Sequence, residues 1–349
     1  MDAAKDYICV RVLDMSGVDL NLYRFDYDLT FAVLLMNGDG TTYHRYGTRD
    51  HLSPTGRLSM TSLVKLLKET LEDHAAYQKA PRPPGPRSPR PIEELPAMVR
   101  KLKSEKIECF HCHMVNDAEH DQAWKEKRYE KDAVVGSWPL PDRVGLKLGR
   151  DEQTRLEGVA PASPAEKAGL RAGDRLVRFG GERVRTQMDV QWVLEQAGAG
   201  DGSIPIEFSR EGSSAPQAAR LEVKKGWKLA DDLGFSWRAS MWQLRPRPGF
   251  GGGQLKAREL EELKLAPGAW AIKVGYIVDW GDEAFFGRSA RQAGIKKGDV
   301  ILSAGGKSDF LSERHFQSWF RFHQKPGTRV PLEILRKGER IRVELPVLE

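Results

Sequence analysis

The chain has 349 residues, with 55 lysines and arginines against 49 aspartates and glutamates, and a formal net charge of +6. This length exceeds what one hydrophobic core usually serves, so we expect two or three domains. The charges are interspersed rather than gathered among aromatic residues, which argues against a nucleic-acid partner. No apolar run approaches the roughly 18 residues of a membrane-spanning helix, and three cysteines are too few for a disulfide scaffold.

The N-terminal third, residues 1–80, has the pattern of a small α/β region. Residues 7–12 read as a strand, and residues 29–36 form an apolar run typical of a strand buried on both faces. Asn37-Gly38-Asp39-Gly40 is a hairpin turn, and residues 41–46 alternate as the returning strand. Residues 60–78 then place leucines on one face of a long amphipathic helix.

A five-residue motif follows a linker. Residues 81–91 are rich in proline and arginine and predict an extended, semi-rigid spacer. Residues 92–140 form a helical segment that contains Cys109-Phe110-His111-Cys112-His113. The spacing Cys-x-x-Cys-His is typical of c-type haem attachment, since two thiols on one helical turn reach the two vinyl groups and the next imidazole faces the iron.

This motif predicts haem c bound covalently by Cys109 and Cys112, with His113 on the iron and His120 or Met114 as candidates for the sixth ligand. Two other interpretations stay open. One is a transition-metal site made by Cys109, Cys112 and either His111 or His113, or an ordinary redox pair of the two thiols. The other is that these residues have no chemical role.

The C-terminal half contains an internal repeat. Residues 165–174 match residues 290–299 at an offset of 125, and the offset persists from Gly180-Gly181 to Gly305-Gly306. Each copy predicts a short helix ended by glycine, a Gly-Asp turn, a strand, a Gly-Gly hairpin, an amphipathic helix and closing strands. Residues 187–197 are that longer helix in the first copy. We expect two copies of one small, mainly β module.

The Ala-Gly-Leu-x-x-Gly-Asp junction, with short strands and two helices, resembles bacterial PDZ domains of the protease-associated type. The resemblance implies one PDZ domain at residues 141–228 and another at 229–349, with an insertion near 238–265. It also implies a groove in which protein C-termini or extended peptides add a strand to a sheet edge. The residues that map to the carboxylate-binding loops and following strands are Val144, Gly145, Leu146, Lys147 and Leu148 in the first domain, and Leu233, Gly234, Phe235 and Ser236 in the second.

The two copies differ in length. Gly145 and Asp174 are 29 residues apart, whereas Gly234 and Asp299 are 65 residues apart. The difference lies beside the second groove, where it could cover or fill it. The first module is therefore expected to be the open binder.

Residues 11–20 and 26–31, together with the strand-turn-strand-helix order, resemble a bacterial family that combines a thioredoxin-like domain with PDZ domains. Some members of that family are selenoproteins. The resemblance implies a multidomain protein in which a partial thioredoxin-like α/β domain precedes two mainly β (α+β) PDZ domains. It also implies a start truncated before the active site, since the strand and helix that carry Cys-x-x-Cys are missing and Tyr27-Asp28-Leu29 replaces the cis-proline.

Location depends on that truncation. As written, the chain has no signal peptide and reads as cytoplasmic, whereas a signal on a lost N-terminus would make it periplasmic or otherwise extracytoplasmic. The sequence therefore predicts an extracytoplasmic redox or electron-transfer protein docked by its PDZ domains. The alternative is a non-catalytic scaffold with a degenerate thioredoxin domain and no haem. The sequence has no Gly-x-Ser-x-Gly, Ser-Gly-Gly or His-Glu-x-x-His motif, so we do not expect a protease, nor an enzyme of another kind, in this chain.

Overall fold

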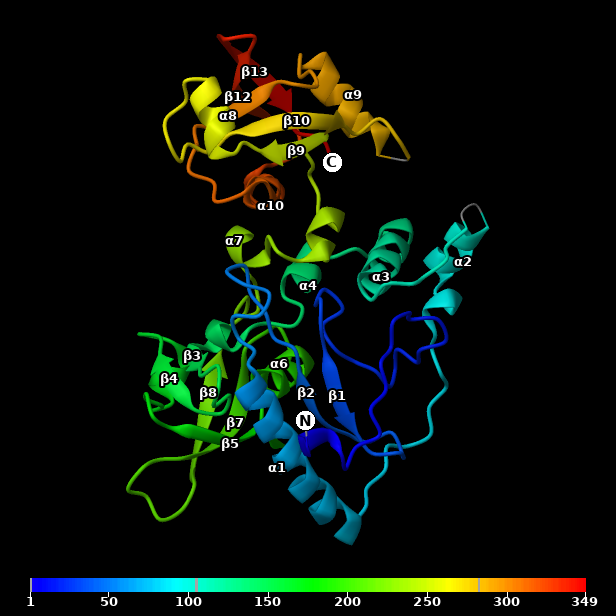
Figure 1. The fold of residues 1–349 in the computed structure, drawn as a ribbon, viewed down its shortest axis with the longest axis vertical. Helices are drawn as coiled ribbons and strands as arrows, with labels where there is room; N and C mark the ends of the chain where they lie inside the picture. Colours follow the sequence, from blue (N-terminus) through cyan, green and yellow to red (C-terminus); the bar gives the residue numbers. More distant parts are fainter. Residues whose placement is uncertain (1, 104–105, 282) are drawn as a thin grey trace. The chain divides into compact units, whose positions relative to one another are not determined.

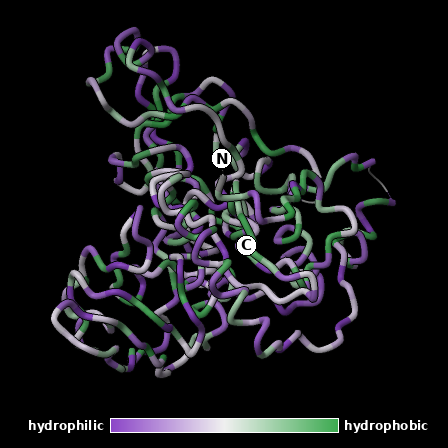
Figure 2. The backbone as a smooth tube through the Cα atoms, turned by 60° about the horizontal axis from the view of Figure 1, so that its bottom comes forward, coloured by the Kyte–Doolittle hydropathy of each residue, from purple (hydrophilic) through white to green (hydrophobic). Residues whose placement is uncertain are grey.

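The computed structural model describes residues 2–103, 106–281 and 283–349. Its contacts divide the chain into two compact units, Met1–Ala230 and Asp231–Glu349 (Figure 1). Hydrophobic and hydrophilic residues alternate over short distances along the chain (Figure 2). Among the described residues, no helix combines the length and hydrophobicity that crossing a membrane requires.

The first unit begins with a hairpin and a helix. After a 3-10 turn, η1 (Asp2–Ala4), strands β1 (Val33–Met36) and β2 (Thr42–Tyr46) pair antiparallel, and helix α1 (Met60–Lys79) packs on them through Leu66. The Ser59 side chain accepts a hydrogen bond from the Ser62 amide and starts α1, which is the usual role of an N-cap serine. The predicted hairpin and long helix are confirmed.

Two strand predictions in this region are wrong in part. Residues 7–12 are not a strand; Ile8 is 96% exposed and Val10 is 79% exposed. Their alternating pattern has no neighbouring strand to pair with, and an unpaired strand is not stable. The apolar run at residues 29–36 is a strand only from Val33, and it is only partly buried. Within residues 2–80 the sheet has two strands, so a thioredoxin-like fold stays a prediction.

Helices follow the linker. Residues 80–91 contain no helix or strand, and residues 80–90 are exposed. The helices after them are η2 (Ile92–Glu94), α2 (Pro96–Leu102), α3 (His113–Lys125) and α4 (Lys131–Val135). The first three surround a small core with residues from the N-terminal loop, made mainly by Met15, Leu20, Ile92, Leu95, Met98, Phe110 and Val115.

The first repeat forms a module with two antiparallel sheets and two helices. Strand β3 (Leu146–Leu148) pairs with β4 (Leu156–Val159), and the other sheet has the order β6-β5-β7-β8. The elements in chain order are η3 (Pro141–Val144), β3, β4, α5 (Pro164–Lys167), β5 (Arg175–Phe179), β6 (Glu182–Arg183), α6 (Gln187–Gln196), β7 (Gly202–Ser209) and β8 (Gln217–Val223). Helix α6 was predicted one residue longer.

The second repeat forms one five-stranded antiparallel sheet with the order β13-β12-β11-β10-β9. The elements in chain order are α7 (Asp232–Phe235), η4 (Ala239–Gln243), β9 (Phe250–Gln254), α8 (Ala257–Glu262), β10 (Ile272–Ile277), α9 (Ala284–Gln292), β11 (Val300–Ala304), α10 (Glu313–His323), β12 (Arg329–Arg336) and β13 (Glu339–Pro346). Its core is aromatic, with Phe250, Trp270, Phe310, Phe316 and Phe320 buried together.

The repeated Gly-Asp turn encodes a buried ion pair. Asp174 is 1% exposed, and its carboxylate accepts from the Arg210 guanidinium at 2.7 Å. Asp299 is 2% exposed and accepts from Arg336 at 2.7 Å in the same way. In both modules the arginine also donates to the carbonyl of the glycine that ends the short helix. In each copy of the repeat, this ion pair therefore joins the Gly-Asp turn to the closing hairpin.

Candidate functional site

The first groove lies between α6 and β3. The Thr186 hydroxyl caps α6 and accepts from the Asp189 amide, which fixes the start of the helix. Strand β3 pairs with β4 on one edge. On the α6 side, the Gln187 side-chain amide donates to the carbonyl of Gly149 at 3.0 Å. The predicted peptide-binding strand thus stands where the resemblance places it, but one of its neighbouring carbonyls is already bonded.

The loop before β3 has the conformation that a close-packed turn requires. Gly145 has φ of +88°, and a Cβ there would lie 2.1 Å from the Ser163 hydroxyl, so only glycine fits. Val144 and Leu146 are fully buried, Leu148 is 7% exposed, and Lys147 is exposed. The apolar side chains of the predicted loop are therefore core residues, and backbone atoms are what they offer a ligand.

Side chains of the N-terminal region contact the first groove, which the sequence predicts to be the open one. The Arg57 guanidinium from the N-terminal region donates to Gln187 at 3.1 Å and pairs with Asp142 at 2.9 Å. The hydroxyl of Thr48 donates to Gln191, one helical turn further along α6, at 2.7 Å. In Figure 1, α6 lies beside β2 of the N-terminal hairpin. The sequence did not indicate this packing because the contacting residues are about 130 positions apart.

The second groove lies between α10 and β9. Strand β9 pairs with β10 as β3 pairs with β4, and Ser312 caps α10 as Thr186 caps α6. The Gln317 side-chain amide donates to the Phe250 carbonyl at 2.9 Å, so it joins the helix to the strand. Gly249, with φ of +79°, precedes β9 as Gly145 precedes β3. Figure 1 shows α10 beside β9.

The predicted loop of the second module is misplaced. Leu233, Gly234 and Phe235 lie in helix α7, and Ser236 ends it, because the Asp231 side chain accepts from the Gly234 amide and caps the helix. Helix α7 packs on α10, away from the edge of the sheet. The true counterpart of the first loop is Gly249 with β9, which we had assigned to the insertion. Part of the extra chain is the connection from β9 to β10, residues 255–271, which contains α8, and part is the longer helix α9.

Charged side chains gather on one face of α10. Glu313, Gln317 and Arg321 follow at spacings of four residues, so they share a face. Arg321 is 3% exposed and donates to Gln317 at 2.7 Å. Burial, together with the like charge of Arg247, lowers the pKa of Arg321 to about 9. Burial also raises the pKa of Glu313.

An aromatic ring covers this cationic region. The Trp242 ring, from η4, lies 5.2 Å from the Arg321 guanidinium and 5.4 Å from that of Arg314. Arg314 also donates to the carbonyls of Ser236 and Arg238. The segment before β9 therefore fixes the arginines of α10 through cation–π contacts and backbone carbonyls.

The Cys-x-x-Cys-His motif lies at the start of α3. Cys109 is exposed, whereas Cys112 is half-buried, 3.5 Å from the Leu29 carbonyl, and burial raises the pKa of its thiol. The His113 imidazole lies 3.4 Å from the Asp117 carboxylate, which raises its pKa. His111 and His113 stack with ring centroids 5.9 Å apart.

Among residues 2–103, 106–281 and 283–349, no three histidine, cysteine, aspartate or glutamate side chains form a group that could hold a metal ion. The metal site predicted from Cys109, Cys112 and His111 or His113 is therefore not among such groups in the described part of the chain. His120 lies against Tyr129, with ring centroids 6.0 Å apart, and burial lowers its pKa. Haem attachment at Cys109 and Cys112 stays a prediction.

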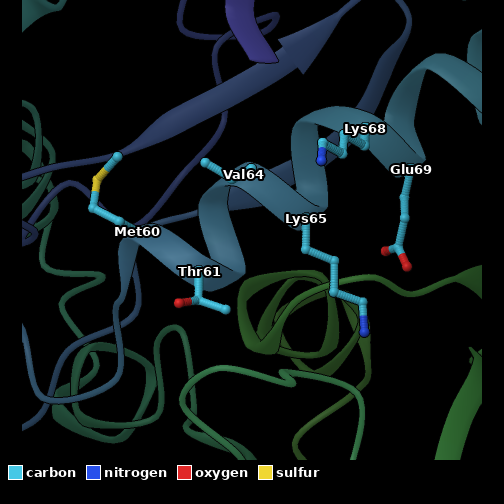
Figure 3. Close-up of a pocket in the computed structure, with 6 residues that line it drawn as sticks. All are labelled: Met60, Thr61, Val64, Lys65, Lys68 and Glu69. Atoms are coloured by element: carbon cyan, nitrogen blue, oxygen red, sulfur yellow. The ribbon is translucent and has the colours of Figure 1, made fainter. Parts of the chain in front are cut away.

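A shallow hollow lies along α1 and is lined by Met60, Thr61, Val64, Lys65, Lys68 and Glu69 (Figure 3). Its residues come from one helix and include no acid–base pair near a nucleophile. Lys65 lies 4.0 Å from Glu152, and Glu69 lies 3.5 Å from Arg185, so both reach the first module. The hollow therefore marks the seam between α1 and that module.

Comparison with known proteins identifies the repeat. The PDZ domain family matches residues 155–208 and again residues 286–347. A probable periplasmic serine endoprotease, DegP-like, from Marinomonas sp. (strain MWYL1) is 24% identical over 202 residues, which are 58% of this chain and 39% of the relative. A probable periplasmic serine protease, do/HhoA-like, from Haemophilus influenzae is 28% identical over 144 residues, 41% of this chain and 25% of the relative. The chain thus spans well under half of either relative.

Two solved structures are also similar. The HtrA-type protease AlgW with a decapeptide is 20% identical with a TM-score of 0.24, over 41% of each chain. The photosystem II D1 C-terminal processing protease is 19% identical with a TM-score of 0.21, over 47% of this chain and 44% of the other.

These relatives correct the redox interpretation. The curated relatives are PDZ-containing serine proteases rather than thioredoxin-like proteins or selenoproteins. The predicted redox or electron-transfer function is therefore wrong, and the scaffold alternative agrees better with the relatives. The predicted pair of PDZ domains is confirmed: the chain contains two of them.

Proposed function

We propose that this chain is a peptide-binding adaptor with a protease-related role, which recognises protein C-termini or extended peptides and carries no catalytic centre of its own. The observation that carries the proposal is the edge of β9 beside α10. Gly253 and Gln254 on this edge are exposed, and β10 pairs with β9 on the opposite side only. An extended peptide binds such an edge by adding a strand.

The glycines of β9 support this assignment. A Cβ at Gly252 would lie 1.9 Å from the Lys273 carbonyl, and a Cβ at Gly251 would lie 2.3 Å from the Tyr276 hydroxyl. At Gly251 and Gly252 the strand therefore lies too close to β10 for a side chain, and these two positions place no side chain in the way of a peptide. We expect ligand specificity to come from α10, where Glu313 is partly exposed and Gln317 is buried against the Phe250 carbonyl.

The charge at one end of the groove suits a C-terminal carboxylate. Gly249 precedes β9 in a left-handed conformation, as Gly145 precedes β3, and we expect the backbone amides of this loop to face the groove end. Arg247 lies two residues before Gly249 in the same loop, and Arg321 adds a second guanidinium from α10. Glu283 pairs with Arg245 and Arg247 and holds the loop in place. A carboxylate gains from this positive field.

Location follows the relatives. Both are named as periplasmic proteases, so we place the adaptor outside the cytoplasm, beside proteolysis rather than in the catalytic step. The N-terminal hairpin and α1 then serve as a structural support for the first PDZ domain, in keeping with a degenerate thioredoxin domain.

The test uses the full chain and a phage library of random heptapeptides with free C-termini. We expect enriched peptides that bind with micromolar affinity and slow hydrogen exchange in residues 250–254 and in α10. Amidated versions of the same peptides are the control for carboxylate recognition. Failure to enrich any peptide, or binding that leaves residues 250–254 unchanged, contradicts the proposed function of this groove.

A further inference from the structure

We propose that residues 48–58, the occluding segment, occupy the peptide groove of the first PDZ domain and close it to peptides while they stay docked. This inference rests on the proposed function, because it concerns which of the two grooves receives a ligand. It assigns the two PDZ domains different states within one chain: the second has exposed residues, Gly253 and Gln254, on the edge of β9, and the first is filled by its own N-terminal region.

Arg57 is the centre of the occlusion. Its guanidinium donates to Gln187, the first residue of α6, at 3.1 Å and pairs with Asp142, in η3, at 2.9 Å. The same group donates to Asp50 of the occluding segment at 2.7 Å. Since α6 is one wall of the groove and η3 leads into β3, the other wall, the guanidinium lies where a peptide would pass. The side chain is only 18% exposed.

The main chain of the segment is also tied to the domain. The Arg57 carbonyl accepts from the Gln153 side chain at 2.8 Å, and the Leu58 carbonyl accepts from Arg150 at 2.7 Å. Both donors belong to the connection from β3 to β4. Backbone carbonyls thus satisfy polar groups of the domain at the groove's end, as the backbone of a bound peptide does.

Thr48 anchors the other end of the segment. It is 1% exposed, and its hydroxyl donates to Gln191 at 2.7 Å. Gln191 also donates to the Trp138 carbonyl, so its amide is bonded on both sides. Gln187 and Gln191 are the α6 side chains that face the groove, and both are at most 3% exposed. A peptide would have to replace all these bonds.

Strand β2 holds the segment in place from the outer side of α6. The Arg45 amide donates to the Asp189 carboxylate at 2.9 Å, and His44 lies 2.9 Å from the same carboxylate. The Thr186 hydroxyl donates back to the Arg45 carbonyl. The occluding segment therefore continues directly from a strand that is fixed to the same helix, and it cannot leave without loosening that strand.

The two domains share a helix-to-strand bond, from Gln187 to the Gly149 carbonyl in the first and from Gln317 to the Phe250 carbonyl in the second. The first domain adds the Arg57 guanidinium, bonded to Gln187, whereas Gly253 and Gln254 at the end of β9 are exposed. The apparent affinity of an occluded groove falls in proportion to the fraction of molecules in which the segment has left. A partner that binds the N-terminal region is thus expected to activate the first groove.

The first test needs no ligand. The Thr48→Val, Arg57→Gln double variant removes both anchors, and Arg178→Gln, an exposed arginine of the same domain, is the matched control. We expect hydrogen exchange in residues 48–58 and 146–149 to accelerate at least tenfold in the double variant and not in the control. If these residues already exchange at the unprotected rate in the wild-type chain, the segment is not docked and the inference is wrong.

Asp142→Asn is a second, milder variant, because the Asp142 side chain is 41% exposed and its loss does not open the core. It removes only the far partner of Arg57. We expect the same regions to exchange faster by a smaller factor. Unchanged exchange in both Asp142→Asn and the double variant overturns the occlusion.

The second test offers the heptapeptide library to the wild-type chain and the double variant. In the wild type, peptides should slow exchange in residues 250–254 alone. In the double variant, they should also protect residues 146–149, with at least tenfold tighter binding to the first domain. Equal protection of residues 146–149 in both proteins overturns the occlusion. Absence of peptide binding at the second domain, with accelerated exchange in the variant, overturns the proposed function and leaves the occlusion standing.

Discussion

Replacing His44 with glutamine should weaken the docking of the N-terminal hairpin in a manner that depends on pH. The imidazole lies between two carboxylates, 2.9 Å from Asp189 on α6 and 3.0 Å from Asp73 on α1. Burial alone would lower the pKa of His44, but the Asp189 and Asp73 carboxylates outweigh it and raise the pKa from 6.5 to about 9. The imidazolium therefore joins three elements.

The magnitude follows from that shift. A pKa raised by about 2.5 units corresponds to about 3 kcal/mol of stabilisation by the proton. Because the folded state binds this proton more tightly, the stabilisation is complete below pH 6.5 and is lost as pH rises through about 9. Arg185 also pairs with Asp73, and that carboxylate helps to raise the pKa of Arg185, so this guanidinium stays charged across the range and does not add to the change.

Pulse proteolysis in urea, with peptides from residues 186–196 quantified by mass spectrometry, measures the stability around α6. The wild type should exceed His44→Gln by about 3 kcal/mol more at pH 6 than at pH 9.5. His74→Gln is the matched control, since His74 lies on the neighbouring helix α1 and its imidazole bonds the Tyr43 hydroxyl rather than the Asp189 and Asp73 carboxylates. A difference between wild type and His44→Gln that is constant from pH 6 to pH 9.5 refutes the argument.

Three further outcomes are expected. Arg336→Gln should lower the free energy of unfolding of the second PDZ domain by about 3 kcal/mol, because it leaves the buried Asp299 carboxylate without its guanidinium. Arg329→Gln, which changes an exposed residue at the other end of the same strand, should alter this free energy little. Urea unfolding compares the two variants, and equal effects would contradict the role of the ion pair. Gly252→Val should prevent folding of the second domain, whereas Gly253→Val, with open space around its Cβ, should preserve it; circular dichroism and exchange in β10 distinguish the two. An alkylating reagent should modify Cys109 several-fold faster than Cys112, because the Cys112 thiol is half-buried and has a raised pKa. Mass spectrometry measures the two rates, and equal rates would show that the start of α3 opens readily.

The repeated module could be predicted from sequence because its determinants are local. Gly-Asp turns, a glycine that ends a short helix and a capped amphipathic helix each need only a few adjacent residues. The same holds for α1, which begins at the capping residue Ser59. These elements appear close to the positions that the pattern indicates.

The groove of the second domain was missed for a physical reason. Strand β9 is Phe250-Gly251-Gly252-Gly253-Gln254, and glycines give no hydrophobic alternation from which a strand can be predicted. Leu233-Gly234-Phe235 imitates Val144-Gly145-Leu146, but Asp231 caps a helix there. Similarity over three residues cannot show whether the chain forms a capped helix or a strand at the edge of a sheet.

The state of the first groove could not be read from sequence at all. The bond between Arg57 and Gln187 joins residues 130 positions apart, and the bond between Thr48 and Gln191 joins residues 143 apart. Neither pair has a local signature, because arginine, threonine and glutamine are ordinary surface residues. The short distance between Gly145 and Asp174 in the first module was a poor indicator of whether its groove is free to bind a peptide.

The glycine strand β9 also affects how copies of this chain behave toward one another. An exposed sheet edge invites pairing between identical edges, which leads to aggregation. Glycine has low β propensity and adds no side-chain contacts, so two β9 edges would gain little from pairing with each other. A peptide rich in β-branched residues supplies the contacts that β9 lacks. The composition of this strand thus favours heterologous ligands over self-association while leaving the edge uncovered.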